Sequence, residues 1–144
     1  MKKDDLLKLE NQLCFPLYAC SREIIKLYKP FLDKLDLTYT QYLTMMVLWE
    51  KNQLSVKELG NELYLDSGTL TPVLKKMESK GLLLRRRSSE DERIMIIIIT
   101  EKGSKLKDKA IEIPHQVFCE THLEKDEAIA LKISLKNLLN KMNN

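Results

Sequence analysis

The stretch from residue 66 to residue 100 constrains the fold more than any other part of this chain of 144 residues. In its first half, apolar residues recur at the spacing of a helix with one buried face. Either Asp66 or Ser67 can cap the start of such a helix, and Gly81 stands where a glycine commonly ends one. The apolar positions are Leu70, Val73, Leu74 and Met77.

A shorter helix is predicted just upstream, over Ser55–Leu63, because the sequence SVKE that begins at Ser55 has the pattern of a capping box. The two helices would form a helix-turn-helix. Downstream we expect one strand at Leu82–Arg86, a tip at Ser88–Glu92 and a second strand at Arg93–Ile99. A helix-turn-helix followed by a basic hairpin is a winged helix, whose second helix enters a DNA major groove while the hairpin reaches the backbone or minor groove.

Small hydrogen-bonding groups and cations lie on the helix face opposite the apolar stripe, and more cations follow in the hairpin. Such groups suit contacts with phosphates and base edges. Asp91 is expected to hold Arg93 at the tip. A packed helical domain with a solvated charged hairpin would look similar, since a net charge of +3 permits nucleic-acid binding without requiring it. The candidate DNA-binding residues are Ser67, Thr69, Thr71, Lys75, Lys76, Arg85, Arg86, Arg87, Asp91 and Arg93.

Composition narrows the class of protein. The length and an apolar content of 44% predict one globular domain. The N-terminus is charged throughout, so we expect no signal peptide, and the longest apolar run, Ile94–Ile99, is too short to span a membrane. The cytoplasm is therefore the expected location. Three cysteines in a reducing compartment are not a disulfide framework, and without a Cys-x-x-Cys pair or a histidine cluster we expect no metal and no cofactor.

The remaining segments read as helices. A long first helix is expected from Asp4 to about Lys29, with Pro16 bending it or restricting its start and Pro30 marking a break after it. Thr38 opens another capping box, and its helix should run to about Lys51 with an apolar stripe. That stripe comprises Tyr42, Met45, Met46 and Trp49.

After the hairpin, Thr100 should cap a long helix from Glu101 to about His122, kinked at Pro114, and a last helix should cover Glu124–Met142. The terminal helices are too apolar to stand alone, and a symmetric DNA reader needs two half-sites, so we expect an intertwined homodimer. Residues 1–144 would form one domain, with 1–35 and 101–144 serving dimerisation and 38–100 forming the winged helix-turn-helix.

The segment DSGTLTPVLKKMESKGLLLRRRSSEDER, which begins at Asp66, resembles the recognition helix and D-x-R wing of MarR-family transcription factors. The resemblance extends over essentially the whole chain, including the flanking helices. It implies a mainly α fold with a small β-hairpin wing, a homodimer that forms through the terminal helices, and an inverted-repeat DNA operator as partner.

Cys14 is the candidate chemical site. An intracellular cysteine is usually a small buried hydrophobe, and Cys20 is interpreted in that way. Near Cys14, however, Tyr18, Tyr28 and Tyr39 can supply phenol donors, which favour the thiolate that peroxides oxidise.

The pattern ENQLCFPLYA around Cys14, with Tyr28 and Tyr39 downstream, resembles the organic-hydroperoxide sensors of the OhrR branch of the MarR family. The resemblance implies that Cys14 is the sensor and that Tyr28 and Tyr39 contact it from the other subunit. It also implies a resolving thiol at Cys119, because the separation from Cys14 matches that in two-cysteine members. Alternatively, Cys119 is a buried hydrophobe and a small thiol resolves oxidised Cys14.

Three functions were weighed. The leading hypothesis is a repressor that leaves its operator when organic hydroperoxide oxidises Cys14. The alternative is a MarR-type repressor released by a small aromatic or anionic ligand, with Cys14 structural. An enzyme, specifically a thiol peroxidase, is disfavoured because Cys14 lacks a Thr-x-x-Cys pattern and a nearby arginine that could polarise a peroxide.

Overall fold

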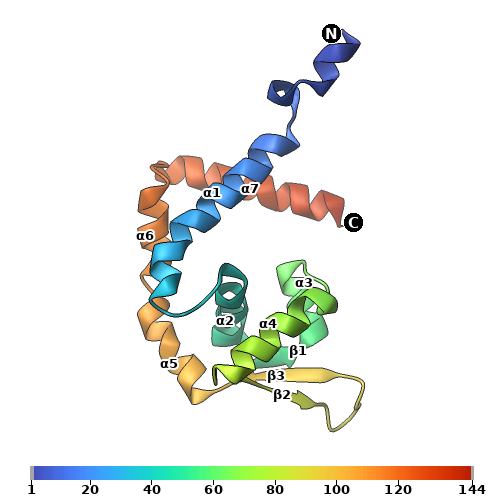
Figure 1. The fold of residues 1–144 in the computed structure, drawn as a ribbon, viewed down its shortest axis with the longest axis vertical. Helices are drawn as coiled ribbons and strands as arrows, with labels where there is room; N and C mark the ends of the chain where they lie inside the picture. Colours follow the sequence, from blue (N-terminus) through green and yellow to red (C-terminus); the bar gives the residue numbers. More distant parts are fainter. Residues whose placement is uncertain (1, 144) are drawn as a thin grey trace. The chain divides into compact units, whose positions relative to one another are not determined.

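The computed structural model describes residues 2–143, which form a mainly helical chain with one small sheet, as predicted. They fall into two compact units, one on each side of the boundary between Ile111 and Glu112. In chain order the elements are the short 3₁₀ helices η1 (Lys3–Leu7) and η2 (Leu9–Asn11), then α1 (Cys14–Asp33), α2 (Tyr39–Lys51), β1 (Gln53–Ser55), α3 (Val56–Leu63), α4 (Ser67–Ser79), β2 (Leu83–Arg87), β3 (Met95–Ile99), α5 (Glu101–Ala110), α6 (Ile113–Glu120) and α7 (Lys125–Met142) (Figure 1).

The helix-turn-helix forms from the capping groups that the sequence indicated. At the start of α3, the Glu58 backbone N–H donates to Ser55 Oγ at 3.0 Å, and the Ser55 N–H donates to the Glu58 carboxylate at 2.8 Å. At the start of α4, Asp66 Oδ1 accepts the Thr69 N–H at 2.6 Å. Gly81 follows α4 with φ of +78°, a conformation that favours glycine, so both ends of this helix are confirmed.

The sheet contains a strand that the sequence did not predict. Its order is β1-β3-β2, antiparallel throughout, with Leu54 opposite Ile97 on one side and Arg85 opposite Ile97 on the other. β1 is three residues long and becomes a strand only by pairing with β3, which a local pattern does not reveal. β2 ends at Arg87, one residue beyond the prediction, whereas β3 begins at Met95 rather than Arg93, so that residues 88–94 form the tip.

Helix α2 lies at the centre of the first unit, where it packs against α1, α3, α4, α5 and the sheet. Because it is surrounded on several sides, Thr44 and Leu48 are buried in addition to Tyr42 and Met45. Met46 is 42% exposed, so the prediction that it belongs to the apolar stripe is wrong. Around α2 the core is completed by Leu59, Leu70, Leu74, Met77, Leu83 and Ile97.

The first helix differs from the prediction at both ends. α1 begins at Cys14 rather than Asp4, since Pro16 fits within a first helical turn, where its missing N–H costs nothing. The expectation that Pro16 restricts the start is thus confirmed. The predicted break at Pro30 is wrong, because α1 continues to Asp33, and the burial of Leu32 favours this last turn.

The predicted long helix after the hairpin is two helices. α5 is capped by Thr100, whose Oγ1 accepts the Gly103 N–H at 3.1 Å, and it ends at Ala110. In the second unit, α6 starts at Ile113 with Pro114 in its first turn, so the proline begins a new helix instead of kinking one. α7 matches the expected last helix, and several of its large apolar side chains are exposed, including Ile129, Leu131, Ile133 and Leu135.

Gly103 fixes the start of α5 against α2 and the sheet. A Cβ atom at this position would collide with the carbonyl oxygen of Leu82 and would lie 3.2 Å from Met45 Cε. The Gly103 carbonyl in turn accepts the indole N–H of Trp49 at 2.9 Å. Only glycine therefore permits this contact between α2 and α5.

We predict that Gly103→Ala lowers the free energy of unfolding by about 1–3 kcal/mol, because the added methyl overpacks the junction. Urea denaturation followed by circular dichroism measures the change. The control is Gly68→Ala, whose methyl would meet only the Asp66 carboxylate, at 3.3 Å, and should change stability by less than about 0.5 kcal/mol. Equal stabilities for the two variants would contradict the assigned packing of Gly103.

Candidate functional site

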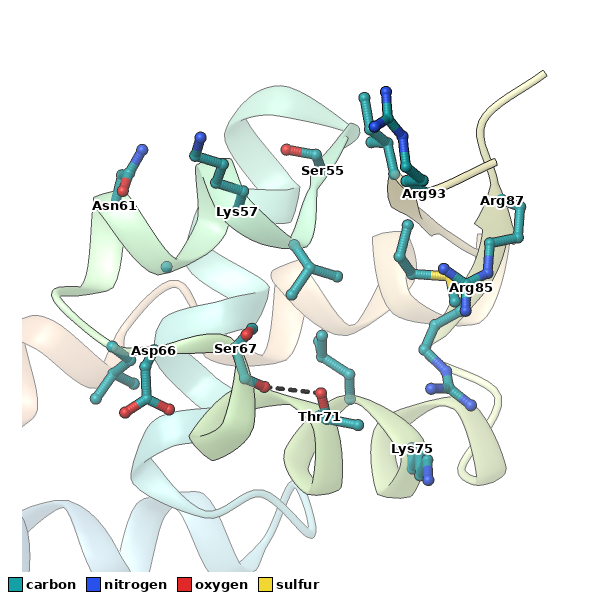
Figure 2. Close-up of a pocket in the computed structure, with 16 residues that line it drawn as sticks. Ser55, Lys57, Asn61, Asp66, Ser67, Thr71, Lys75, Arg85, Arg87 and Arg93 are labelled. Carbon is teal, nitrogen blue, oxygen red and sulfur yellow. Dashed lines mark hydrogen bonds between the residues drawn. The ribbon is translucent and has the colours of Figure 1, made fainter. Parts of the chain in front are cut away.

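A groove of about 710 Å³ lies between α3, α4 and the hairpin (Figure 2). The charges around it are strongly unequal, because five cationic side chains line it and Asp66 is the one carboxylate among the lining residues. Such a groove attracts a polyanion. Its polar lining comprises Ser55, the cap of α3, Lys57 and Asn61 from α3, Asp66, Ser67, Thr71 and Lys75 from the α4 side, and Arg85, Arg87 and Arg93 from the hairpin.

The α4 side of the groove presents one face of the helix. Ser67, Thr71 and Lys75 are four residues apart and therefore lie one above the other. The Thr71 hydroxyl donates to the Ser67 carbonyl at 2.7 Å (Figure 2). The Asp66 carboxylate accepts the Thr69 N–H, which lowers its pKa and keeps it occupied as a helix cap. The face that remains for an external partner is thus formed by hydroxyls and a cation.

The three consecutive arginines of β2 have different roles. Successive side chains of a strand point to opposite faces, so Arg85 and Arg87 line the groove while Arg86 lies on the other face of the sheet. Arg85 is held by Glu78 of α4, with Nη2 3.1 Å from Oε1 and its backbone N–H 2.8 Å from Oε2. Donation by that backbone N–H is the main cause of the lowered pKa of Glu78. Arg85 therefore anchors the hairpin to α4.

The hairpin tip has the predicted acid–arginine pair. Arg93 donates from Nε and Nη2 to the two oxygens of Asp91, each at 3.1 Å, and its backbone N–H also donates to Asp91. These bonds, chiefly those from the side chain, lower the pKa of Asp91. The Arg93 side chain is 91% exposed, so the pair holds a cation in place without burying it.

The groove gathers six of the ten predicted DNA-binding residues: Ser67, Thr71, Lys75, Arg85, Arg87 and Arg93. Thr69 and Lys76 are exposed on α4 outside its lining, and Asp91 acts through Arg93. The contribution of α3 to the groove was not predicted from the sequence. Lys57 and Asn61 are four residues apart on the polar face of that helix, and this spacing was the available signal.

Cys14 is the first residue of α1, and it is exposed. The preceding residue, Leu13, provides no side-chain cap, so backbone N–H groups at this helix end are free to face an anion. This setting was missed from the sequence because the helix was expected to start at Asp4.

The tyrosines form a cluster between α1 and α2. Ring centroids are 4.9 Å apart for Tyr28 and Tyr39, and 5.7 Å apart for Tyr28 and Tyr42. Burial, with smaller contributions from Tyr39 and Tyr42, raises the pKa of Tyr28 to about 12. Burial likewise raises the pKa of Tyr39. Both hydroxyls therefore stay protonated at neutral pH and remain available as donors.

Cys14 and Tyr28 cannot meet within one chain. They are fourteen residues apart on the continuous helix α1, which at 1.5 Å per residue separates them by about 21 Å along the helix axis. Tyr18 is one turn from Cys14, but it is exposed and its ring lies under the Arg22 guanidinium, 5.4 Å from the centroid. A site that joins Cys14 to the Tyr28 cluster thus requires a second chain.

The other two cysteines differ in setting. Cys20 is exposed on α1, so its interpretation as a buried hydrophobe is wrong. It lies about 9 Å along the axis from Cys14, which is too far for a disulfide within the helix. Cys119 is exposed near the end of α6, and its Sγ lies 3.7 Å from His115 Nε2. Within residues 2–143, no three histidine, cysteine or acidic side chains are grouped to hold a metal.

In the same range, no helix is both long enough and apolar enough to cross a membrane.

Comparison with known proteins places the chain in a family. Residues 26–110 match the family described as transcriptional regulator SarA/Rot. The organic hydroperoxide resistance transcriptional regulator of Bacillus subtilis is 54% identical over 137 residues, covering 95% of this chain and 93% of the relative.

Two solved structures of AbfR, a Staphylococcus epidermidis protein, are also similar. Reduced AbfR bound to DNA matches with a TM-score of 0.79 at 33% identity, covering 99% of this chain and all of that one. Disulfide-formed AbfR matches with a TM-score of 0.66 at 34% identity, covering 95% and 96%. These relatives are regulators rather than enzymes, and the chain belongs to the MarR/SarA family of winged-helix transcriptional regulators.

Proposed function

We propose that this protein is a cytoplasmic, homodimeric repressor that leaves an inverted-repeat DNA operator when organic hydroperoxide oxidises Cys14. The observation that carries the proposal is the position of Cys14 at the start of α1, about 21 Å from Tyr28 of the same helix. Because Cys14 can contact these tyrosines only in a second chain, oxidation of its sulfur is coupled to the relative position of the two chains. That position also sets the spacing of the two DNA-binding helices.

DNA is the partner that fits the groove. α4 enters the major groove, where Ser67, Thr69 and Thr71 face bases and phosphates, while Lys75 and Lys76 contact the backbone. Arg87 and Arg93 approach phosphates from the hairpin, and Lys57 does so from α3. The similarity to an AbfR structure that contains DNA supports this assignment.

A second copy of the chain completes the molecule. The exposed apolar side chains of α7 and of the segment before α1 provide surface for it, including Leu9, Leu13, Ile129 and Ile133. A twofold dimer places its two α4 helices in half-sites about one helical turn of DNA apart, roughly 10 base pairs.

Sensing begins with the thiolate of Cys14. The sulfur attacks the terminal oxygen of the peroxide, the O–O bond breaks and a sulfenic acid remains, while the leaving alkoxide takes a proton from water to become an alcohol. Hydroxyls of Tyr28 and Tyr39 from the second chain donate to the sulfur. Cys119, or a small thiol in its place, then condenses with the sulfenic acid to a disulfide. The lower similarity of this chain to disulfide-formed AbfR than to reduced AbfR supports a change of shape at this step.

The wing can be tested by charge reversal. Arg93→Glu should weaken operator binding on the order of tenfold and reduce the salt dependence of binding, because one phosphate contact is lost. Fluorescence anisotropy with labelled operator at several salt concentrations measures both effects. The control is Lys107→Glu, an equal charge change at an exposed position of α5 that does not line the groove. Equal effects of the two changes would assign the result to net charge and reject the wing contact.

The sensor can be tested by replacing single atoms. Cys14→Ser should bind operator as the wild type does and should not be released by cumene hydroperoxide, because the oxidisable sulfur is gone. Tyr28→Phe and Tyr39→Phe should slow the release, since each removes one hydroxyl donor from the sulfur. Cys20→Ser is the matched control and should respond normally. Release of the Cys14→Ser protein by peroxide would refute the redox mechanism, and release by a small ligand instead would support the ligand-controlled alternative.

A further inference from the structure

Helix α6 carries a cysteine and a histidine that face each other. Cys119 and His115 are four residues apart, which places them on one side of the helix, and Sγ lies 3.7 Å from Nε2. This distance suits a hydrogen bond to sulfur, which is longer than one between nitrogen and oxygen. Both side chains are exposed, so a reagent or another chain can reach them.

We propose that His115 is the general base for Cys119: it takes the thiol proton when Cys119 condenses with the sulfenic acid of Cys14. This inference rests on the proposed function, because it assigns a residue to the second step of that redox reaction. It also makes Cys119, rather than a small thiol, the group that resolves oxidised Cys14. Among residues 2–143, His115 is the one side chain that forms a hydrogen bond with Cys119.

The place of each residue in α6 suits this role. His115 is in the first turn of α6, and its Nε2 lies 3.7 Å from the sulfur one turn further along. Cys119 is in the last turn of the same helix. A neutral imidazole at this distance can accept the thiol proton as the sulfur attacks.

The contrast with Cys14 assigns the two steps to different cysteines. Cys14 is exposed at the start of α1 and can meet a peroxide directly. Cys119 is near the end of α6, where His115 is one helical turn away. A thiol that attacks needs an adjacent base to take its proton, and His115 is that base.

The atoms of the condensation balance without another oxidant. Nε2 of His115 takes the proton from Sγ of Cys119, and the sulfur attacks the sulfenic sulfur of Cys14. An S–S bond forms as the S–O bond breaks, and the leaving hydroxide recovers the proton from the imidazolium as water. The organic hydroperoxide has already accepted the two electrons in the first step.

The test separates the two oxidation steps in the full-length protein. His115→Gln should form the Cys14 sulfenic acid at the wild-type rate, measured by dimedone trapping and mass spectrometry. It should form the disulfide with Cys119 more slowly, on the order of tenfold to a hundredfold, measured on non-reducing gels after acid quenching. Free imidazole added to His115→Ala should restore part of the rate, which a merely structural role would not permit.

The matched control is His122→Asn. His122 is the other histidine of the chain, and its φ of +58° is one that asparagine tolerates. This variant should form both products at the wild-type rates. A wild-type rate of disulfide formation in His115→Gln would overturn the role of His115.

The wild-type protein distinguishes failure of this inference from failure of the proposed function. If its sulfenic acid forms but no bond to Cys119 follows, the role of His115 is refuted while sensing by Cys14 stands. If peroxide leaves Cys14 unmodified, both proposals are refuted.

Discussion

The rise of an α-helix imposes the main constraint on this molecule. Between Cys14 and Tyr28, α1 is unbroken, so the sulfur and the tyrosine cluster lie at opposite ends of one rigid element. In the proposed mechanism, a single chain therefore carries both parts of the sensor but cannot bring them together. Oxidation of the sulfur would then depend on how two chains are placed, and so would the spacing of the two recognition helices.

The geometry of the DNA-binding groove depends on how α4 and the hairpin are held in place, and not only on their charges. The buried stripe of α4 fixes that helix on the core, and the pair between Glu78 and Arg85 fixes the hairpin to the same helix. The cationic side chains of α4 and of the hairpin are therefore held at fixed positions relative to each other. A chain with the same charges but without this pair would attract DNA with a less defined geometry.

Local signals explain which parts of the fold could be predicted. The caps at Ser55, Asp66 and Thr100 and the glycine at Gly81 depend on neighbours within a few residues, and the structure has all four. The start of α1 was misplaced because Leu6, Leu9 and Leu13 keep helical spacing although all three are exposed. These three leucines form an exposed apolar surface and do not belong to α1.

The errors elsewhere come from contacts between distant residues. β1 is a strand because β3 is beside it, and the last turn of α1 persists through Pro30 while Leu32 is buried. In the site, the hydroxyls and cations of α4 could be predicted from one helix face. The role of Arg85 could not, because it requires knowing that β2 returns to Glu78. The function of Cys14 was inferred from resemblance, and its place at a helix start came only with the structure.

Trp49 lies at the junction between α2 and α5, where its fluorescence can report on the contact between these helices. It is the one tryptophan of the chain, its ring lies 6.4 Å from that of Tyr42, and its N–H donates to the carbonyl of Gly103. The molecule therefore carries a single indole fluorophore, next to Tyr42 and the start of α5. Any motion that separates α2 from α5 breaks the indole hydrogen bond and alters the polarity around the ring. Its emission spectrum thus reports on that junction in unlabelled protein.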